Sequence, residues 1–275
     1  MLARDGVAYL EENLKSLTDE ARSEAEIFVS HTLNVSRGSL KITAQEISKE
    51  TLEDFIEKRK KGEPLQYILG KWDFYKWEFY VGEGVLIPRQ DTETLVEVAT
   101  DFLKTKENPG VIDLCSGSGC VAISIAADYK DAQIIAAEKY EKAFYYLEKN
   151  IKHNKANNVK PVLTDITKDV FGEYDLIVSN PPYITKKDME NLPKEVKSEP
   201  ETALFGGNDG LYFYRVIAEK WIPRLKKGGM LAVEIGIGQE GQVIEIFEKS
   251  GLKNVRTKKD LCGVQRVVFG TADII

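Results

Sequence analysis

The sequence reads VIDLCSGSG from Val111 to Gly119 and continues directly as CVAISIAA to Ala127. A short β-branched run, a glycine-rich turn and a longer apolar run are typical of a strand, a tight turn and a helix. Glycine adopts backbone angles that a Cβ forbids and lets a ligand approach the chain closely. Such units recur in doubly wound α/β domains, which bind ligands at the carboxyl ends of their strands. The stretch therefore predicts an α/β domain with a ligand at this turn.

An acidic residue ends the next predicted strand. The run from Ala132 to Ala137 stops at Glu138, where a carboxylate can accept hydrogen bonds from both hydroxyls of a ribose. The turn is neither a GxxxxGK[ST] phosphate loop nor a complete GxGxxG motif, because CVA follows Gly119. A nucleoside without a pyrophosphate fits better, and S-adenosylmethionine is such a ligand. A plain α/β domain with a glycine turn is the alternative.

The tetrapeptide Asn180, Pro181, Pro182 and Tyr183 follows a third strand-like run, YDLIVS. Its two prolines fix φ and remove two N–H donors, which leaves a stiff backbone with free carbonyls. The Asn180 side-chain oxygen and the Pro181 carbonyl can accept both hydrogens of a planar NH2 group, while the Tyr183 ring covers its face. An ordinary strand-ending turn is the alternative for the tetrapeptide taken alone. Together with the glycine turn, it predicts a site for such a group.

Composition favours an enzyme of the cytoplasm. The chain has 275 residues, of which 43% are hydrophobic and 30% charged, enough for one large domain or two with a sizeable core. Its apolar runs fall far below the roughly 18 residues of a membrane span, and Met1 to Gly6 lacks a signal-peptide pattern. Three cysteines without zinc spacing and two histidines give little material for a metal site. We therefore expect no metal, no membrane association and a cytoplasmic protein.

The net charge of −6, without a long basic stripe, counts against DNA or RNA as the substrate. It does not remove that alternative.

The first two zones of the chain differ in pattern. Residues 1–62 predict a helical bundle, in which TAQE at Thr43–Glu46 looks like a capping box that starts a helix. Residues 63–90 predict a β-hairpin linker with short strands, which we expect at 66–70, 72–79 and 80–87.

The third zone, residues 91–275, alternates helical and strand patterns. Strands are expected near residues 111, 133, 161, 174 and 230, which predicts a doubly wound, mostly parallel sheet with helices on both faces. Two last strand-like pieces, near 253–258 and 264–269, are separated by a short loop and predict an antiparallel pair at the sheet edge. Residues 186–210, rich in charge and glycine, predict a mobile loop beside the tetrapeptide.

Four sequence blocks resemble the release-factor glutamine methyltransferases, the HemK/PrmC family, over nearly all of the chain. The most specific is the first, and the second and third are shared with many adenine, cytosine and amide methyltransferases. The blocks are PLQYI at Pro64 with VLIPR at Val85 and the Thr92-Glu93 pair; the glycine turn; the tetrapeptide with its flanks; and EP at Glu199 with GG and DGL between Gly206 and Leu211.

The resemblance implies a seven-stranded Rossmann-like methyltransferase sheet behind a small helical domain that grips the substrate. Such enzymes methylate the side-chain amide nitrogen (N5) of glutamine in the Gly-Gly-Gln motif of class I peptide chain release factors. The methyl donor is S-adenosyl-L-methionine and the product S-adenosyl-L-homocysteine. No nucleic-acid substrate and a monomer are expected.

By position, the resemblance also assigns roles to residues. Asn180 to Tyr183 would hold the glutamine amide, and Asn180 would also touch the methionine end of the cofactor. The chain departs from the family at the first loop residue, usually glycine, at the ribose acid, usually aspartate, and at the residue beside the adenine, commonly aromatic. The cofactor set is Asp113, Cys115, Ser116, Gly117, Ser118, Gly119, Glu138 at the ribose, and Asp165 and Ile166 at the adenine.

The tetrapeptide contains no general base, so a positional mechanism is expected. Two acceptors would orient the amide nitrogen and stabilise the positive charge that grows on it. Arg89 and Glu93 would either orient the hairpin over the cleft or form a surface ion pair. Two rival functions remain: a nucleic-acid adenine-N6 or cytosine-N4 methyltransferase acting on a flipped base, and a non-catalytic binding module with the same fold.

Overall fold

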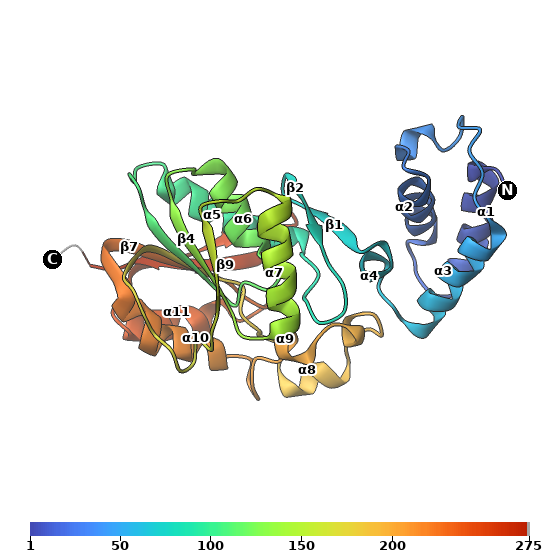
Figure 1. Cartoon of the computed structure of the whole chain (residues 1–275). Helices are drawn as coiled ribbons and strands as arrows, with labels where there is room; N and C mark the ends of the chain where they lie inside the picture. Colours follow the sequence, from blue (N-terminus) through green and yellow to red (C-terminus); the bar gives the residue numbers. More distant parts are fainter. Residues whose placement is uncertain (274–275) are drawn as a thin grey trace. The chain divides into compact units, whose positions relative to one another are not determined.

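The computed structural model describes residues 1–273 and contains two compact units (Figure 1). Unit 1 comprises Met1–Lys71 and Pro193–Ser198, and unit 2 comprises Trp72–Leu192 and the chain from Glu199 onward. The expected domain boundaries at residues 62 and 90 stay predictions. Within residues 1–273, no helix is both long and apolar enough to span a membrane.

Unit 1 is helical, as predicted. Leu10, Val29 and Leu52 are fully buried in its core, and the rings of Phe28 and Phe55 stack with centroids 3.9 Å apart. Its elements are α1 (Ala3–Leu14), α2 (Ala21–Leu33), η1 (Arg37–Ser39), α3 (Lys49–Lys61), α4 (Leu65–Leu69) and η3 (Val196–Ser198).

The predicted capping box in unit 1 is wrong. Helix α3 begins at Lys49, and its N-cap is Ser48, whose Oγ accepts a hydrogen bond from Thr51 N at 3.0 Å. Thr43 Oγ1 accepts from Gln45 N instead, within a non-helical segment. Both sites offer a hydroxyl to the backbone, so the local pattern could not choose between them.

None of the three strands predicted in the linker is present as predicted. Residues 66–70 form most of the one-turn helix α4 and its left-handed cap Gly70, φ 73°. The predicted strand 72–79 is interrupted by a turn at Tyr75, φ 57°, which separates β1 (Lys71–Phe74) from β2 (Trp77–Tyr80). Residues 81–87 are not a strand. A hairpin is present, but it is shorter than predicted.

The large sheet of unit 2 has the predicted mostly parallel arrangement. Its order is β5-β4-β3-β6-β7-β9-β8, and β9 is antiparallel to both of its neighbours, which confirms the predicted edge pair. Its strands are β3 (Gly110–Leu114), β4 (Gln133–Glu138), β5 (Val159–Leu163), β6 (Tyr174–Ser179), β7 (Leu225–Glu234), β8 (Lys253–Lys259) and β9 (Gln265–Thr271).

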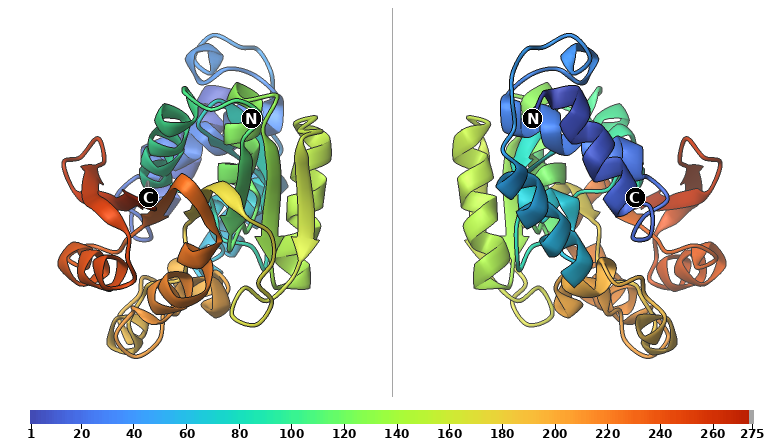
Figure 2. Two further views of the ribbon diagram at one scale, coloured as in Figure 1. Left: turned by 90° about the vertical axis from the view of Figure 1, so that its left-hand side faces the viewer. Right: turned by 90° about the vertical axis from the view of Figure 1, so that its right-hand side faces the viewer.

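Helices cover both faces of this sheet because its central strands are apolar on both sides. Val111 packs in the cluster with α5, α6 and α7, while its neighbour Ile112 packs in the cluster with α10 and α11. Figure 1 shows α5 and α6 on one side and α10 and α11 on the other, and the turned views of Figure 2 agree. The helices are α5 (Glu93–Leu103), α6 (Cys120–Asp128), α7 (Glu141–His153), α10 (Tyr212–Val216) with its continuations η4 (Ile217–Trp221) and η5 (Ile222–Arg224), and α11 (Glu240–Lys249).

The expected loop 186–210 contains short helices. They are α8 (Lys186–Glu190), η3 in unit 1, and α9 (Glu201–Leu204). Glu195 pairs with the buried Arg59 at 2.5 Å, and Ser198 Oγ donates to Gly62 O at 2.9 Å, which holds residues 193–198 in unit 1. The mobility of this segment stays a prediction.

Strand register places the ends of four strands in a row. Leu114 pairs with Ala137 on one side and with Ser179 on the other, and Ser179 pairs with Val233. The next residue on each strand is therefore Cys115, Glu138, Asn180 or Glu234. The chain order reverses between β3 and β6, and such a switch point is where open α/β sheets bind ligands.

Candidate active site

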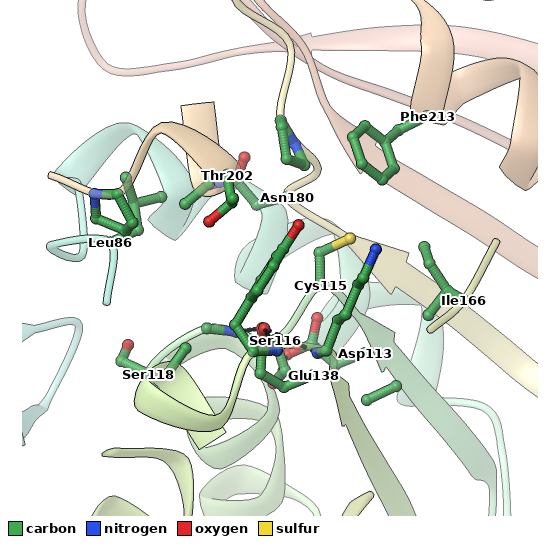
Figure 3. A pocket seen from close by; sticks show the side chains of 18 of the residues that line it. Leu86, Asp113, Cys115, Ser116, Ser118, Glu138, Ile166, Asn180, Thr202 and Phe213 are labelled. Carbon is green, nitrogen blue, oxygen red and sulfur yellow. Dashed lines mark hydrogen bonds between the residues drawn. The ribbon is translucent and has the colours of Figure 1, made fainter. Parts of the chain in front are cut away.

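A cavity lies at this switch point, entirely within unit 2 (Figure 3). Most of the predicted site residues line it; Gly119, Pro181 and Tyr183 are not among its lining residues. In Figure 3, Ile166 and Phe213 lie on one side, Leu86 and Thr202 on the other, and Cys115 between them. The predicted residues in the lining are Asp113, Cys115, Ser116, Gly117, Ser118, Glu138, Asp165, Ile166, Asn180 and Pro182.

The glycine turn adopts backbone angles that explain its composition. Gly119 has φ 83°, and a Cβ there would meet Leu147 Cδ1 at 2.5 Å, so the turn packs tightly against α7. Cys115 also has a positive φ, 59°, at the position where the resembling family usually has glycine. A left-handed conformation is unfavourable for a side chain, and this accounts for the usual glycine.

The side chain of Asp113 accepts hydrogen bonds from the glycine turn and from the start of α6. Its Oδ2 accepts hydrogen bonds from Ser116 Oγ at 2.6 Å and from Ala122 N at 3.3 Å. Burial raises the pKa of Asp113 to about 7, although these hydrogen bonds act to lower it. The carboxylate therefore links the start of α6 to the turn.

Glu138 is held by three backbone N–H groups. Its Oε2 accepts from Gly117 N at 2.9 Å, and its Oε1 accepts from Lys139 N at 2.8 Å and Tyr140 N at 2.9 Å. Burial raises its pKa, and the three hydrogen bonds act against that rise. An ionised carboxylate offers about four acceptor positions, so capacity remains for a ligand in the cavity.

Asp165 and Ile166 form the far end of the cavity. Burial alone would raise the pKa of Asp165, but hydrogen bonds from Thr167 and Lys139 outweigh it and lower the pKa to about 2. The carbonyl of Ile166 accepts a hydrogen bond from Trp221 Nε1 at 3.0 Å. Phe213 lies on the same side of the cavity as Ile166 (Figure 3) and brings an aromatic ring that the sequence pattern lacked.

Asn180 has a fixed orientation. Its Nδ2 donates to Thr92 Oγ1 at 3.2 Å, and Thr92 ends the short helix η2 (Gln90–Thr92). This contact leaves the side-chain oxygen Oδ1 as the acceptor that the cavity can use.

The hydroxyl group of Tyr183 points away from the cavity. The hydroxyl donates to Glu234 Oε1 at 3.3 Å, and burial is the main cause that raises its pKa. Gly206 lies against the tetrapeptide backbone, because a Cβ there would meet Tyr183 Cα at 2.6 Å. Ile184 N donates to Leu204 O at 2.8 Å, so the last residue of α9 is bonded to the residue that follows the tetrapeptide.

Arg89 and Glu93 both serve internal contacts. Arg89 pairs with Glu199, whose side chain is 2% exposed and whose second oxygen accepts from Ile87 N at 3.0 Å. Glu93 accepts from Tyr75 N at 2.9 Å and so fixes the hairpin turn. The two residues therefore do not pair with each other on the surface.

Sequence reasoning missed three residues at this site. Thr92 was noticed only as part of a family block, and Phe213 carries no local signal. Glu234 follows the apolar run from Met230 to Val233, which is the same pattern that singled out Glu138. That pattern could have found it.

Cysteine reactivity gives a test of the turn. Burial, with the nearby Glu138 and Asp113, raises the pKa of Cys115 well above 9, and burial raises that of Cys120 to about 12, whereas Cys262 is exposed. Since the thiolate is the reactive form, we expect iodoacetamide at pH 7.5 to label Cys262 about 100-fold faster than the other two. Peptide mass spectrometry measures the rates, and urea-unfolded protein is the control in which all three react. Labelling of Cys115 as fast as Cys262 would contradict the described turn.

No group of three or more His, Cys, Asp or Glu side chains in residues 1–273 is arranged to hold a metal ion.

Comparison with known proteins gives two family matches. The model of the methyltransferase small domain matches residues 90–204, and that of the PrmC N-terminal domain matches residues 4–70.

Two curated relatives match this chain over at least nine tenths of their length. The chain is 39% identical over 257 residues to the release factor glutamine methyltransferase of Thermodesulfovibrio yellowstonii, covering 90% of this chain and 91% of that one. It is 37% identical over 266 residues to the enzyme of the same description from Aquifex aeolicus, with 94% of each chain covered.

A solved structure shows the same fold at low identity. It is the hMettl16 catalytic domain in complex with the MAT2A 3'UTR hairpin 6, with a TM-score of 0.57, 16% identity, and coverage of 70% of this chain and 73% of that one.

Proposed function

Because this chain belongs to the family of release factor glutamine methyltransferases, we propose that it methylates the side-chain amide nitrogen (N5) of glutamine in the Gly-Gly-Gln motif of class I peptide chain release factors. The observation that carries the proposal is the orientation of Asn180. Its amide nitrogen is committed to Thr92, so its oxygen remains to accept a hydrogen bond from a second amide in the cavity.

The described cavity fits S-adenosylmethionine better than a ligand with a pyrophosphate. Its basic side chains Lys139 and Arg89 are paired with Asp165 and Glu199. When bound, this cofactor would supply a methyl group that positive sulfur activates for transfer. Glu138 would accept hydrogen bonds from the ribose, and the adenine would lie near Ile166 and Phe213.

The substrate amide would be oriented by two acceptors. Asn180 Oδ1 and the Pro181 carbonyl would accept its two N–H bonds and turn its nitrogen toward the methyl donor. The same oxygens would stabilise the positive charge that develops on nitrogen. A nitrogen that carries this charge is acidic and loses its proton without a strong base. The tetrapeptide therefore needs no histidine or cysteine.

Unit 1 supports a protein substrate. Its residues 4–70 match the PrmC N-terminal domain, and we assign to this unit a role in gripping the release factor. A cytoplasmic site of action follows from that substrate. The fold alone does not distinguish an amide from a nucleic-acid base, because the hMettl16 domain shares it in complex with an RNA hairpin.

Three incubations test the proposed function. The purified protein receives methyl-labelled S-adenosylmethionine and, separately, an unmodified release factor, the same release factor with Gly-Gly-Gln changed to Gly-Gly-Ala, and duplex DNA. We expect label on the unmodified release factor alone. Label on DNA without label on the release factor would mean that the tetrapeptide binds a nucleic-acid base. Absence of label on all three, together with absence of cofactor binding, would favour a non-catalytic module.

A further inference from the structure

Arg89 is a cationic side chain of the cavity wall to which the proposed function assigns no ligand. The side chain lines the cavity and is 38% exposed. Leu86 and Pro88, shortly before it in the chain, line the cavity as well. Figure 3 shows Leu86 on the side opposite Ile166, near which the adenine is expected. Arg89 therefore belongs to the wall that the cofactor assignments leave open.

A buried carboxylate holds the guanidinium of Arg89 in place. Glu199, whose side chain is 2% exposed, pairs through Oε1 with Arg89 Nη2. Its Oε2 accepts a hydrogen bond from Ile87 N at 3.0 Å, so the carboxylate is also fixed to the backbone beside Arg89. A guanidinium is planar and carries five N–H donors. Since the pair with Glu199 is made by Nη2, donors on the other nitrogens remain for a ligand.

Two hydrogen bonds connect Arg89 to the proposed amide site. Thr92 N donates to Arg89 O at 3.1 Å, and Thr92 Oγ1 accepts from Asn180 Nδ2 at 3.2 Å. The main chain of Arg89 and the side chain of Asn180 therefore contact the same residue. Glutamine and arginine both have long side chains, so the peptide backbone of a glutamine bound at Asn180 would come within reach of the guanidinium.

The charge balance of this pair favours a neutral acceptor. Glu199 already compensates the charge of Arg89, so a carboxylate or phosphate would gain little net attraction there. The remaining N–H groups are still strong donors because they belong to a cation, and a peptide carbonyl oxygen is a neutral acceptor. The two glycines of Gly-Gly-Gln have no side chains, so a protein can recognise them by their backbone groups.

We propose that Arg89 is a substrate-binding residue, which donates hydrogen bonds to backbone carbonyl oxygens of the Gly-Gly-Gln segment, and that Glu199 is the positioning residue that holds it. This inference rests on the proposed function. The contact is made to the peptide backbone and not to the reacting nitrogen, so it stabilises the bound substrate and the transition state alike. Its loss should therefore raise KM for the release factor and leave kcat nearly unchanged.

Arg89→Met tests the inference, because methionine keeps an unbranched apolar chain and removes the donors. We expect KM for the release factor to rise about 10-fold or more, as for a lost hydrogen bond to a charged group, with kcat and the dissociation constant for S-adenosylmethionine within about threefold. The Gly-Gly-Ala release factor keeps the same backbone, and its affinity as a competitive inhibitor should fall by the same factor. Arg256→Met, at an exposed arginine of the edge strand β8, is the matched control and should behave as wild type.

Three results would overturn the inference. The first is unchanged binding of both release factors. The second is a raised KM with unchanged affinity for the Gly-Gly-Ala protein, which would place the contact of Arg89 on the glutamine side chain. The third is weaker binding of S-adenosylmethionine with unchanged KM for the release factor, which would assign Arg89 to the carboxylate of the cofactor.

A double variant separates substrate binding from a purely structural role. Arg89→Met leaves Glu199 as a buried carboxylate without its cation, which alone would disturb the cavity wall. Glu199→Gln removes that charge and keeps an acceptor for Ile87 N. The combined variant should therefore keep the raised KM of Arg89→Met, whereas recovery of the wild-type KM would show that Arg89 only compensates Glu199 and would overturn the inference. Failure of the wild-type protein to methylate the release factor would instead count against the proposed function.

Discussion

Asn180→Ala should lower kcat for methyl transfer to the release factor by about 10³-fold and leave cofactor affinity within about threefold. The substitution removes Oδ1, one of two acceptors that would orient the substrate nitrogen, and leaves Thr92 without its donor. Orientation and charge stabilisation act on the reacting nitrogen and not on the ribose or adenine. The loss should therefore appear in kcat.

The measurement pairs single-turnover methyl transfer with calorimetric titration of S-adenosylmethionine. Asn157→Ala is the matched control, because Asn157 is exposed and precedes the edge strand β5, at the end of the strands away from the cavity. It should behave as wild type in both assays. Near-normal turnover of the Asn180 variant would show that Asn180 does not orient the substrate amide. A large loss of cofactor affinity would show that Asn180 serves to bind the cofactor instead.

The strands of unit 2 could be predicted from sequence because each is a short apolar run that local composition specifies. Val111 to Leu114 and Tyr174 to Ser179 are buried in the sheet, so their β-branched character is required by packing on both faces. Their order in the sheet was not predicted beyond the fold class, a doubly wound and mostly parallel sheet. The edge pair at β8 and β9 was predicted because its connection is too short for a parallel crossover.

The errors cluster where several local choices are nearly equal. Thr43 and Ser48 both offer a hydroxyl for a helix start, and the helix begins directly after Ser48. The aromatic run after Trp72 has strand character throughout, yet a turn at Tyr75 divides it, with Glu93 accepting from the Tyr75 N–H. That contact joins residues far apart in the chain, so no local pattern contains it.

The same limit applied to the site. Glu138 and Asn180 were predicted because each directly follows a strand, whereas the contact between Asn180 and Thr92 spans 88 positions. Sequence reasoning could therefore name the groups that would touch ligands. It could not find Thr92, which holds Asn180 in place, because that contact depends on how distant segments of the chain pack together.

The strongest effect on cofactor binding is expected for Glu138→Ala, which should raise the dissociation constant for S-adenosylmethionine about 100-fold. Hydrogen bonds to a charged group contribute about 1.5–3 kcal/mol each, and 2.7 kcal/mol corresponds to a factor of about 100. Alanine would also leave Gly117, Lys139 and Tyr140 without the acceptor of their N–H groups. The glycine turn would lose its anchor to β4.

Two further variants serve as controls for Glu138→Ala. Glu148→Ala removes an exposed glutamate from α7 and should leave the titration unchanged. Glu138→Asp restores the acid that is usual in the family with a side chain one methylene shorter, and we expect a loss of less than about tenfold. If Glu138→Ala bound the cofactor within threefold of wild type while the Asn180→Ala protein bound it poorly, the two strand ends would have the opposite roles. Because the register of β4, β3 and β6 brings the ends of these strands side by side, the cofactor would then be bound by the end of β6 and not by the end of β4.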